Sequence, residues 1–289
     1  MQSTAGFQRM NFGNMPNDGG GLILNEEEKN KLLSENPNSE KFIRKLIGST
    51  EFINGINRYC LWIEDDELDD ALQDNFIKSK IEISKNHRLN SKDKGTNKLA
   101  LRAHQFRDRN TAIDSAIIVP STSSERREYI PLGFLSKETI ILNSALAIYD
   151  AQPWLFGVLH SKMHMIWVDA VGGKLKTDYR YSAKLCYNTF PFPELNEKQK
   201  ETLNQYVFAV LDQRAKYPEK TMAWLYNPET MPAALLQAHK DLDAAVERIY
   251  RLAHFHSDEE RLEYLFKLYD EMTKKETLFA KEKRVRKKK

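Results

Sequence analysis

Long apolar runs and cysteine are what this 289-residue sequence most clearly lacks. No stretch approaches the roughly 18 to 20 apolar residues of a membrane helix, and the first twenty residues lack the basic-then-apolar layout of a signal peptide. The two cysteines, Cys60 and Cys186, lie in strand-like apolar surroundings (RYCLW and KLCYN), and no CxxC pair suggests zinc. We therefore expect a soluble, cytoplasmic protein with no membrane partner and with two buried, reduced thiols.

Motifs of catalytic sites are also scarce. The segment NDGGG, Asn17 to Gly21, has neither the lysine and serine or threonine of a P-loop nor the spacing of a G-x-G-x-x-G turn, which favours a tight turn. His160 and His164 have the spacing of two metal ligands on a helix, but no glutamate follows His160, and the apolar surroundings favour core or interface histidines. No histidine is placed to activate the serines beside Glu125. The sequence predicts no catalytic residue, cofactor site or metal site in this chain.

Charge is unevenly distributed. The net charge is +3, but nine basic and two acidic residues give Lys274 to Lys289 a charge of +7, which leaves −4 for the first 273 residues. A basic tail of this density is usually solvated and disordered, and it can contact phosphates without sequence preference. With 41% hydrophobic residues, the chain can bury a sizeable core and has the length of two domains.

The pattern changes near residue 193. Beyond it the sequence predicts three amphipathic helices: one capped by Asn196, one with Pro232 near its start, and one that begins at the capping box of Ser257 and Glu260. Residues 194–289 are therefore expected to form a helical domain with a basic tail from about residue 274.

Residues 1–193 mix short helices with short strands. Helices are predicted in NEEEKNKLLSEN and SEKFIRKLIG, over Glu67–Arg88 and over Pro153–Val171. Strands are predicted in RYCLWIE, SAIIVP, REYIPLGFL, ETIILNS and LAIYD, and KLCYNTFPFP is strand-like. The expected fold class is α+β: a mixed domain of short strands and helices over residues 1–193, followed by a helical bundle.

The stretch KLKTDYRYS spaces opposite charges two residues apart. On a strand, Lys176, Asp178 and Arg180 would share one face, because successive side chains alternate between faces. In the major groove of DNA, lysine donates to guanine O6 and N7 while aspartate accepts from cytosine N4, so a Lys and an Asp on one face fit a G·C pair. The same charges would also fit a surface ion pair, worth about 0 to 1 kcal/mol, and the pattern alone does not separate the two.

Two further segments place arginine beside small polar residues. They are RDRN, which contains Arg107 and Arg109, and SSERRE at Ser123–Glu128. Arginine in such settings contacts phosphates and guanine, and asparagine contacts adenine. Both segments are candidate DNA contacts.

Several blocks, in order, resemble the C-terminal portion of MmeI-like (type IIL) restriction-modification enzymes. The similarity spans nearly the whole chain, through FGNMPNDGGGLILNEEE, GSTEFINGINRYCLWI, SSERREYIPLGFL, GVLHSKMHMIWV, GKLKTDYRYSAKLCYNTFPFP and LYNPETMPAALLQAHKDLDAAVERIY. In that family one polypeptide carries a nuclease, a helical connector, an S-adenosylmethionine-dependent adenine-N6 methyltransferase, a target recognition domain and a helical C-terminal domain. This chain resembles the last two, and it lacks the N-P-P-[YF], F-x-G-x-G and PD-ExK motifs of the others.

The resemblance also implies roles for individual residues. The family's specificity positions are two charged residues one apart before R-Y-S, which here are Lys176 and Asp178, and the order lysine-then-acid implies a guanine at the last specified position. Arg180, Asn143 and Ser144 resemble positions associated with a neighbouring base pair. Further possible contacts are Ser121, Ser124, Arg126 and Arg127.

The implied function is sequence-specific reading of double-stranded DNA for catalytic domains absent from this chain. By resemblance, S-adenosylmethionine and Mg²⁺ belong to the parent enzyme, the upstream methyltransferase and nuclease domains are partners, and the chain alone is catalytically inactive. Two alternatives remain: the recognition domain of a methyltransferase without a nuclease, or a protein-interaction scaffold whose helical bundle and apolar segment Trp154–Trp167 dock a partner.

Overall fold

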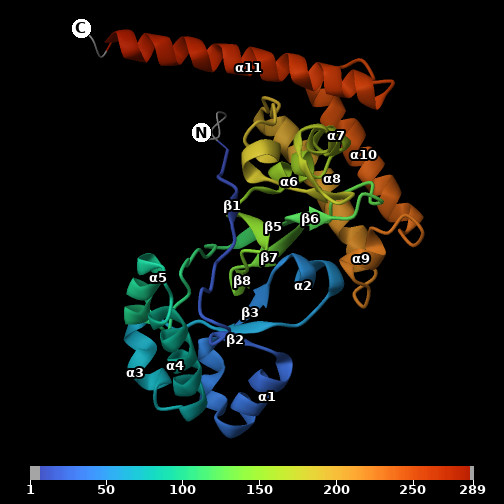
Figure 1. Cartoon of the computed structure of the whole chain (residues 1–289). Coiled ribbons are helices and arrows are strands. Elements are labelled where there is room, and N and C mark those ends of the chain that lie inside the picture. Colours follow the sequence, from blue (N-terminus) through green and yellow to red (C-terminus); the bar gives the residue numbers. More distant parts are fainter. Residues whose placement is uncertain (1–6, 287–289) are drawn as a thin grey trace. The chain divides into compact units, whose positions relative to one another are not determined.

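The chain folds into two compact units (Figure 1). The computed structural model describes residues 7–286, with side chains described as far as Lys274. The sheet unit comprises Met10–Pro120 and Gly133–Asp150, and the helical unit comprises Met1–Arg9, Ser121–Leu132 and Ala151–Lys289. The predicted α+β class is confirmed, with 50% helix and 15% strand.

Two four-stranded sheets build the sheet unit. The first has the order β1-β9-β5-β7 and is antiparallel, and the second has the order β2-β4-β3-β8, with β3 and β8 parallel. The strands are β1 (Asn11–Phe12), β2 (Ile23–Leu24), β3 (Ile43–Ile47), β4 (Tyr59–Leu61), β5 (Ser115–Pro120), β7 (Gly133–Ser136), β8 (Thr139–Ile141) and β9 (Ala145–Tyr149). The helices are α1 (Glu26–Glu35), α2 (Ser49–Asn54), α3 (Leu68–Ala71), α4 (Asn75–Leu89) and α5 (Lys94–Lys98), with 3-10 turns at Pro37–Phe42, Asp65–Glu67 and Leu99–Arg102.

Most predicted elements of this unit are present. SAIIVP forms the central strand β5, and five of its six residues are buried, as expected for an apolar run without alternation. The helix predicted in SEKFIRKLIG is wrong: the segment is a 3-10 turn followed by β3, whose pairing with β4 and β8 overrides its helical spacing. REYIPLGFL is a strand only from Gly133.

Arg88, at the end of α4, is a fully buried cation. Its guanidinium donates at 2.6 to 3.1 Å to five backbone carbonyls, those of Pro16, Asn17, Leu99, Arg102 and Gln105. Burial lowers the pKa of Arg88. Because these carbonyls lie in two segments, Pro16–Asn17 and Leu99–Gln105, Arg88 ties both segments to α4.

The predicted tight turn at NDGGG is confirmed. Asn17, Gly19 and Gly20 have positive φ angles of 48°, 63° and 85°. The Asp18 carboxylate accepts the amides of Gly20 and Leu22 at 3.1 and 2.5 Å. The segment is therefore held by its own acid.

The helical unit is built around α8 and α10, which pack against each other, with α6 against α8 and α11 against α7. Its helices are α6 (Pro153–Leu159), α7 (Lys162–Val171), α8 (Glu197–Ala215), α9 (Met222–Leu225), α10 (Ala233–Tyr250) and α11 (Asp258–Arg286). Its strands are β6 (Thr122–Ser123), β10 (Gly173–Leu175) and β11 (Asp178–Arg180), and Ala183–Tyr187 is a π-helical turn. The three predicted C-terminal helices are confirmed, with Asn196 and Ser257 as caps.

The apolar segment Trp154–Trp167 is core. It forms α6 and α7, separated at His160 and Ser161, and Trp154 and Trp167 are 9% and 1% exposed. These two tryptophans are not available to dock a partner, so the apolar segment does not supply the surface that the scaffold hypothesis gave it.

Two predictions at the C-terminal side need correction. KLCYNTFPFP is not a strand: Ser182 caps the π-helical turn by accepting from the Leu185 amide at 3.3 Å, and Cys186 is buried within that turn. The basic tail is helical to Arg286 as part of α11, because lysine, glutamate, leucine and alanine favour helix and pairs such as Lys274–Asp270 join successive turns. The side chains beyond Lys274 lie outside the described residues.

Both cysteines are free and buried, as predicted, and burial raises the pKa of each thiol. None of the helices described here is both long and apolar enough to cross a membrane.

Candidate nucleic-acid interface

KLKTDYRYS forms a β-hairpin, which corrects the expected single strand. β10 and β11 pair antiparallel, with Leu175 opposite Asp178, so Lys176 and Thr177 are the two residues of the turn. Asp178 and Arg180 share a face of β11, whereas Lys176 lies at the tip. The turn aims the lysine independently of the other two side chains.

Lys176 has an unusual backbone conformation. Its φ angle is +58°, which glycine or asparagine adopts far more readily than lysine. Only the first of the two turn residues has positive φ, a position where two-residue hairpins favour glycine. Such strain costs about 1 to 3 kcal/mol and is concentrated at functional sites.

The charged side chains of the hairpin differ in their contacts. Lys176 and Arg180 are exposed and Asp178 is half-buried, and no described residue forms a hydrogen bond or ion pair with any of the three side chains. Lys174 instead pairs with Asp169 at 2.6 Å and lies 3.9 Å from the centre of the Tyr179 ring. Lys174 thus stabilises the hairpin, while Lys176 and Arg180 stay open to a ligand.

A third strand brings the segment Ser121–Leu132, the 121–132 loop, beside the hairpin. β6 pairs with β11, with Tyr179 opposite Ser123, and the Tyr181 amide donates to the Ser121 carbonyl at 2.9 Å. The structure therefore gathers Lys176, Asp178 and Arg180 with four other predicted contacts. These are Ser121, Ser124, Arg126 and Arg127.

The two arginines of this loop have different surroundings. Arg126 is exposed and pairs with Glu229. Arg127 donates to Ser123 Oγ at 3.2 Å, and its Nε has no hydrogen-bond partner among the described residues. Burial lowers the pKa of Arg127, and the negative charge of Asp178 opposes this shift. Arg127 is therefore a half-buried cation beside the candidate base-reading acid.

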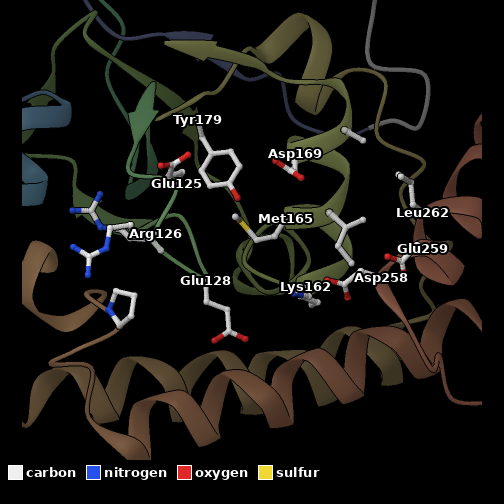
Figure 2. A pocket seen from close by; sticks show the side chains of 14 residues that line it. Glu125, Arg126, Glu128, Lys162, Met165, Asp169, Tyr179, Asp258, Glu259 and Leu262 are labelled. Atoms are coloured by element: carbon white, nitrogen blue, oxygen red, sulfur yellow. Dashed lines mark ion pairs between the residues drawn. The ribbon is translucent and has the colours of Figure 1, made fainter. Parts of the chain in front are cut away.

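A pocket of about 530 Å³ lies next to the hairpin. Figure 2 shows Tyr179 and Met165 among its lining side chains, with residues of the 121–132 loop, α7 and the start of α11. Five carboxylates and three basic side chains line it, and Lys162 and Asp169 have their own ion-pair partners. An excess of acid makes the pocket itself a poor phosphate site, so the DNA-binding candidate is the hairpin together with the loop arginines Arg126 and Arg127, which also line the pocket.

Asn143 and Ser144 lie in the sheet unit, at the corner between β8 and β9. The Ser144 carbonyl accepts from Ser49 Oγ at 2.6 Å, and the Ser144 hydroxyl accepts from the Ser49 amide at 3.3 Å. The Asn143 amide group contacts Met15 Sδ at 2.8 Å. This corner is well anchored, and Ser144 is exposed.

Arg107 and Arg109 also lie in the sheet unit, and both have acidic partners. Arg107 pairs with Asp108 at 2.9 Å. Arg109 pairs with Glu64 at 2.6 Å, and its guanidinium lies 4.0 Å from the centre of the Trp62 ring. These contacts with Glu64 and Trp62 indicate that Arg109 stabilises the fold of the sheet unit.

His160 and His164 are buried in the helical unit, as the sequence favours. His164 Nε2 lies 2.7 Å from the Tyr181 hydroxyl, and burial lowers the pKa of His164 to about 3. The described residues include no group of three His, Cys, Asp or Glu side chains that could hold a metal ion.

The comparisons with known proteins agree on one family. Residues 1–194 match the family described as MmeI, target recognition domain, and residues 195–277 match MmeI, C-terminal domain. DNA methyltransferase A of Bacillus subtilis (strain 168) is 51% identical over 267 residues, which cover 92% of this chain and 30% of that protein.

A solved structure shows the same fold. The type IIL restriction-modification enzyme MmeI in complex with DNA superposes with a TM-score of 0.90 at 37% identity, over 95% of this chain and 37% of that one. The chain therefore spans about a third of the length of these relatives. The resemblance found in the sequence is confirmed: this chain belongs to the MmeI family, as its target recognition domain followed by its C-terminal domain.

Proposed function

We propose that this chain reads a specific double-stranded DNA sequence for a site-specific adenine-N6 methyltransferase and type II endonuclease, whose catalytic domains lie elsewhere in the parent polypeptide. The observation that carries the proposal is Lys176, exposed on a strained two-residue turn in a family of target recognition domains. The recognition domain would span residues 1–193 and the helical domain residues 194–289. The two family models, which meet between residues 194 and 195, support this division.

The hairpin chemistry fits a G·C pair. A two-stranded ribbon enters the major groove, where the Lys176 ammonium would donate to guanine O6 and N7 and the Asp178 carboxylate would accept from cytosine N4. Each good contact of this kind discriminates by about 1 to 3 kcal/mol. Because the side chains of Lys176 and Arg180 form no ion pair with described residues, binding DNA through them would break no internal ion pair.

Other contacts would extend the site. We assign Arg180, Asn143 and Ser144 to a neighbouring base pair and the 121–132 loop to further bases or phosphates. The candidates in this loop are Ser121, Ser124, Arg126 and Arg127. Arg107 and Arg109 are weaker candidates, since each is already paired with an acid.

By resemblance to the family, the cofactors of the parent would bind its other domains. The described residues include no group of three His, Cys, Asp or Glu side chains that could hold a metal ion, and the glycine-rich turn at Asn17–Gly21 is held by the Asp18 carboxylate. On this proposal, S-adenosylmethionine and Mg²⁺ act in those other domains, and this chain alone would neither methylate nor cleave DNA. The whole enzyme would act in the cytoplasm, where it meets DNA.

A second candidate function gives this chain the same role in a different parent enzyme. The 51% identical relative is named a DNA methyltransferase, which favours a parent without a nuclease. Assays of the full-length protein for methyl transfer and for cleavage separate the two, because both parents methylate and only one cleaves.

The test is selection from a random duplex pool. The chain and its Lys176→Glu/Asp178→Arg variant are incubated with the pool at low salt, washed at moderate salt, and the retained DNA is sequenced. We expect two motifs that differ at one G·C pair. Retention without any motif, or identical motifs from both proteins, would contradict base reading by the hairpin.

A further inference from the structure

The 121–132 loop is held at both ends. At its start, β6 pairs with β11. At its end, Tyr129, Ile130 and Leu132 bond to groups on three helices, and Tyr129 and Leu132 are 1% and 2% exposed. Between these ends lie Ser124, Arg126 and Arg127.

Tyr129 joins the loop to α10 and α7. Its hydroxyl donates to Asp243 Oδ2 at 2.6 Å, and Asp243 Oδ1 accepts from the Lys162 amide, also at 2.6 Å. The Tyr129 ring stacks on His239, with the ring centres 4.3 Å apart. One acid of α10 thus positions both the loop and the start of α7.

Arg214 joins the loop to α8. This buried guanidinium donates to the Leu132 carbonyl and the Tyr226 hydroxyl, each at 2.6 Å, and lies 3.3 Å from His160 Nδ1. The Tyr226 hydroxyl in turn lies 2.8 Å from His239 Nε2. The loop end, α8 and α10 therefore share one hydrogen-bond network.

Stability alone does not explain this buried hydrogen-bond network. His239 Nδ1 is buried without a hydrogen-bond partner among the described residues, and such a group loses the stabilisation of water. Apolar residues of similar volume often stabilise a core as well as buried ionic groups do, or better. Directional bonds, however, fix one position of the loop, which apolar packing does less strictly.

We propose that Tyr129, Arg214 and Asp243 are positioning residues for DNA reading: they hold the 121–132 loop in the geometry in which Arg126 and Arg127 meet DNA. The inference rests on the proposed function and extends it, because it gives the C-terminal helices a part in recognition. Tyr129 and Arg214 are buried, and both oxygens of the Asp243 carboxylate accept internal hydrogen bonds, so none of the three side chains is available to DNA.

The experiment compares Tyr129→Phe with a control substitution that also removes only a few atoms from a buried side chain. Tyr129→Phe removes one hydroxyl, and Val207→Ala removes buried volume from α8 at a side chain that faces Gly157 of α6. Both are studied in the full chain at a temperature where each is folded by circular dichroism. The readouts are the Kd for the duplex selected by the wild type and hydrogen exchange of the amides of residues 124–128.

We expect Tyr129→Phe to weaken binding about three- to tenfold and to speed exchange in the loop about tenfold, because a local anchor is lost. Val207→Ala should lower Tm and leave both readouts near wild type. Equal effects of the two variants, or wild-type binding and exchange in Tyr129→Phe, would overturn the proposal.

Asp243→Asn provides a conservative rescue. An asparagine can accept from the Lys162 amide and donate to the Tyr129 oxygen, so binding should stay within about twofold of wild type, while Asp243→Ala should behave like Tyr129→Phe. A loss in Asp243→Asn as large as in Asp243→Ala would contradict positioning by hydrogen bonds. If the wild type selects no motif, the proposed function itself fails, which is a distinct outcome.

Discussion

The cations of the hairpin and those of the core differ in what surrounds them. Arg88 and Arg214 are buried; Arg88 donates to backbone carbonyls, and Arg214 donates to the Leu132 carbonyl and the Tyr226 hydroxyl. Lys176 and Arg180 are exposed, and no described residue pairs with their side chains. Residue type alone therefore does not indicate a DNA contact. A buried cation whose N–H groups are hydrogen-bonded within the protein stabilises the fold, whereas an exposed cation on a strained turn is available to a ligand.

The largest effect is expected at Arg88, the buried cation with the most hydrogen bonds to backbone carbonyls described above. We expect Arg88→Met to lower the free energy of unfolding by about 3 to 5 kcal/mol, because several buried carbonyls lose their donor. Urea denaturation measures the effect, with Lys85→Met, exposed on the same helix, as control. A loss below about 1 kcal/mol would show that water replaces the guanidinium and that the core cation is not structural.

Buried histidines should make stability depend on pH. The pKa of His164 is lowered to about 3, so between pH 3 and 6.5 the unfolded chain binds more protons and stability falls as the pH falls. From pH 7 to 5 this loss is about 2 kcal/mol, and His164→Gln should remove it, while exposed His87→Gln should not. The pKa of Asp243 is raised to about 7, so protonation of this carboxyl makes stability rise as the pH falls. This contribution is common to the wild type, His164→Gln and His87→Gln. Identical pH profiles for wild type and His164→Gln would contradict this account.

Lys176→Gly separates stability from binding. Glycine tolerates the φ angle of +58°, so we expect unfolding to cost about 0.5 to 1 kcal/mol more, while DNA affinity falls. Thr177→Gly is the matched control, since Thr177 does not have positive φ, and it should destabilise by a similar amount. Thermal melts and Kd values measure both. Unchanged affinity in Lys176→Gly would mean that the strained lysine does not read DNA.

The smallest expected effect is at Arg126. Its exposed pair with Glu229 should contribute less than about 0.5 kcal/mol to stability. If Arg126 contacts a phosphate, Arg126→Ala should reduce the slope of log K against log salt by about 0.9. Arg44→Ala, which removes a half-buried arginine paired with Glu138 in the sheet unit, should leave the slope unchanged. Equal slopes in all three proteins would exclude a phosphate contact at Arg126.

Much of the fold was predictable because local patterns agree with tertiary structure. The apolar run of β5, the caps of α8 and α11 and the buried thiols follow from the sequence. The strand at Ile43–Ile47 did not, because its pairing partners β4 and β8 lie elsewhere in the sequence.

The geometry of the candidate site was predictable in part. The sequence singled out Lys176 and Asp178, whose role stays a prediction, but the hairpin was missed, because Lys-Thr lacks the Asn-Gly or Asp-Gly signal of a tight turn. β6 is only two residues long and gives no periodic signal. Arg214 and His239 did leave a signal: each stands at a position that helical spacing assigns to the buried face, beside Val210 and Leu235.

The most direct test of base reading is a two-by-two set of affinities. The wild type and Lys176→Glu/Asp178→Arg are titrated, at one salt concentration, against two duplexes that differ only by exchange of G·C for C·G at the pair distinguished by selection. The account predicts an inversion: each protein prefers a different duplex, by about 1 to 3 kcal/mol. The same preference in both proteins, or none in either, would contradict the assignment of Lys176 and Asp178 as base-reading residues.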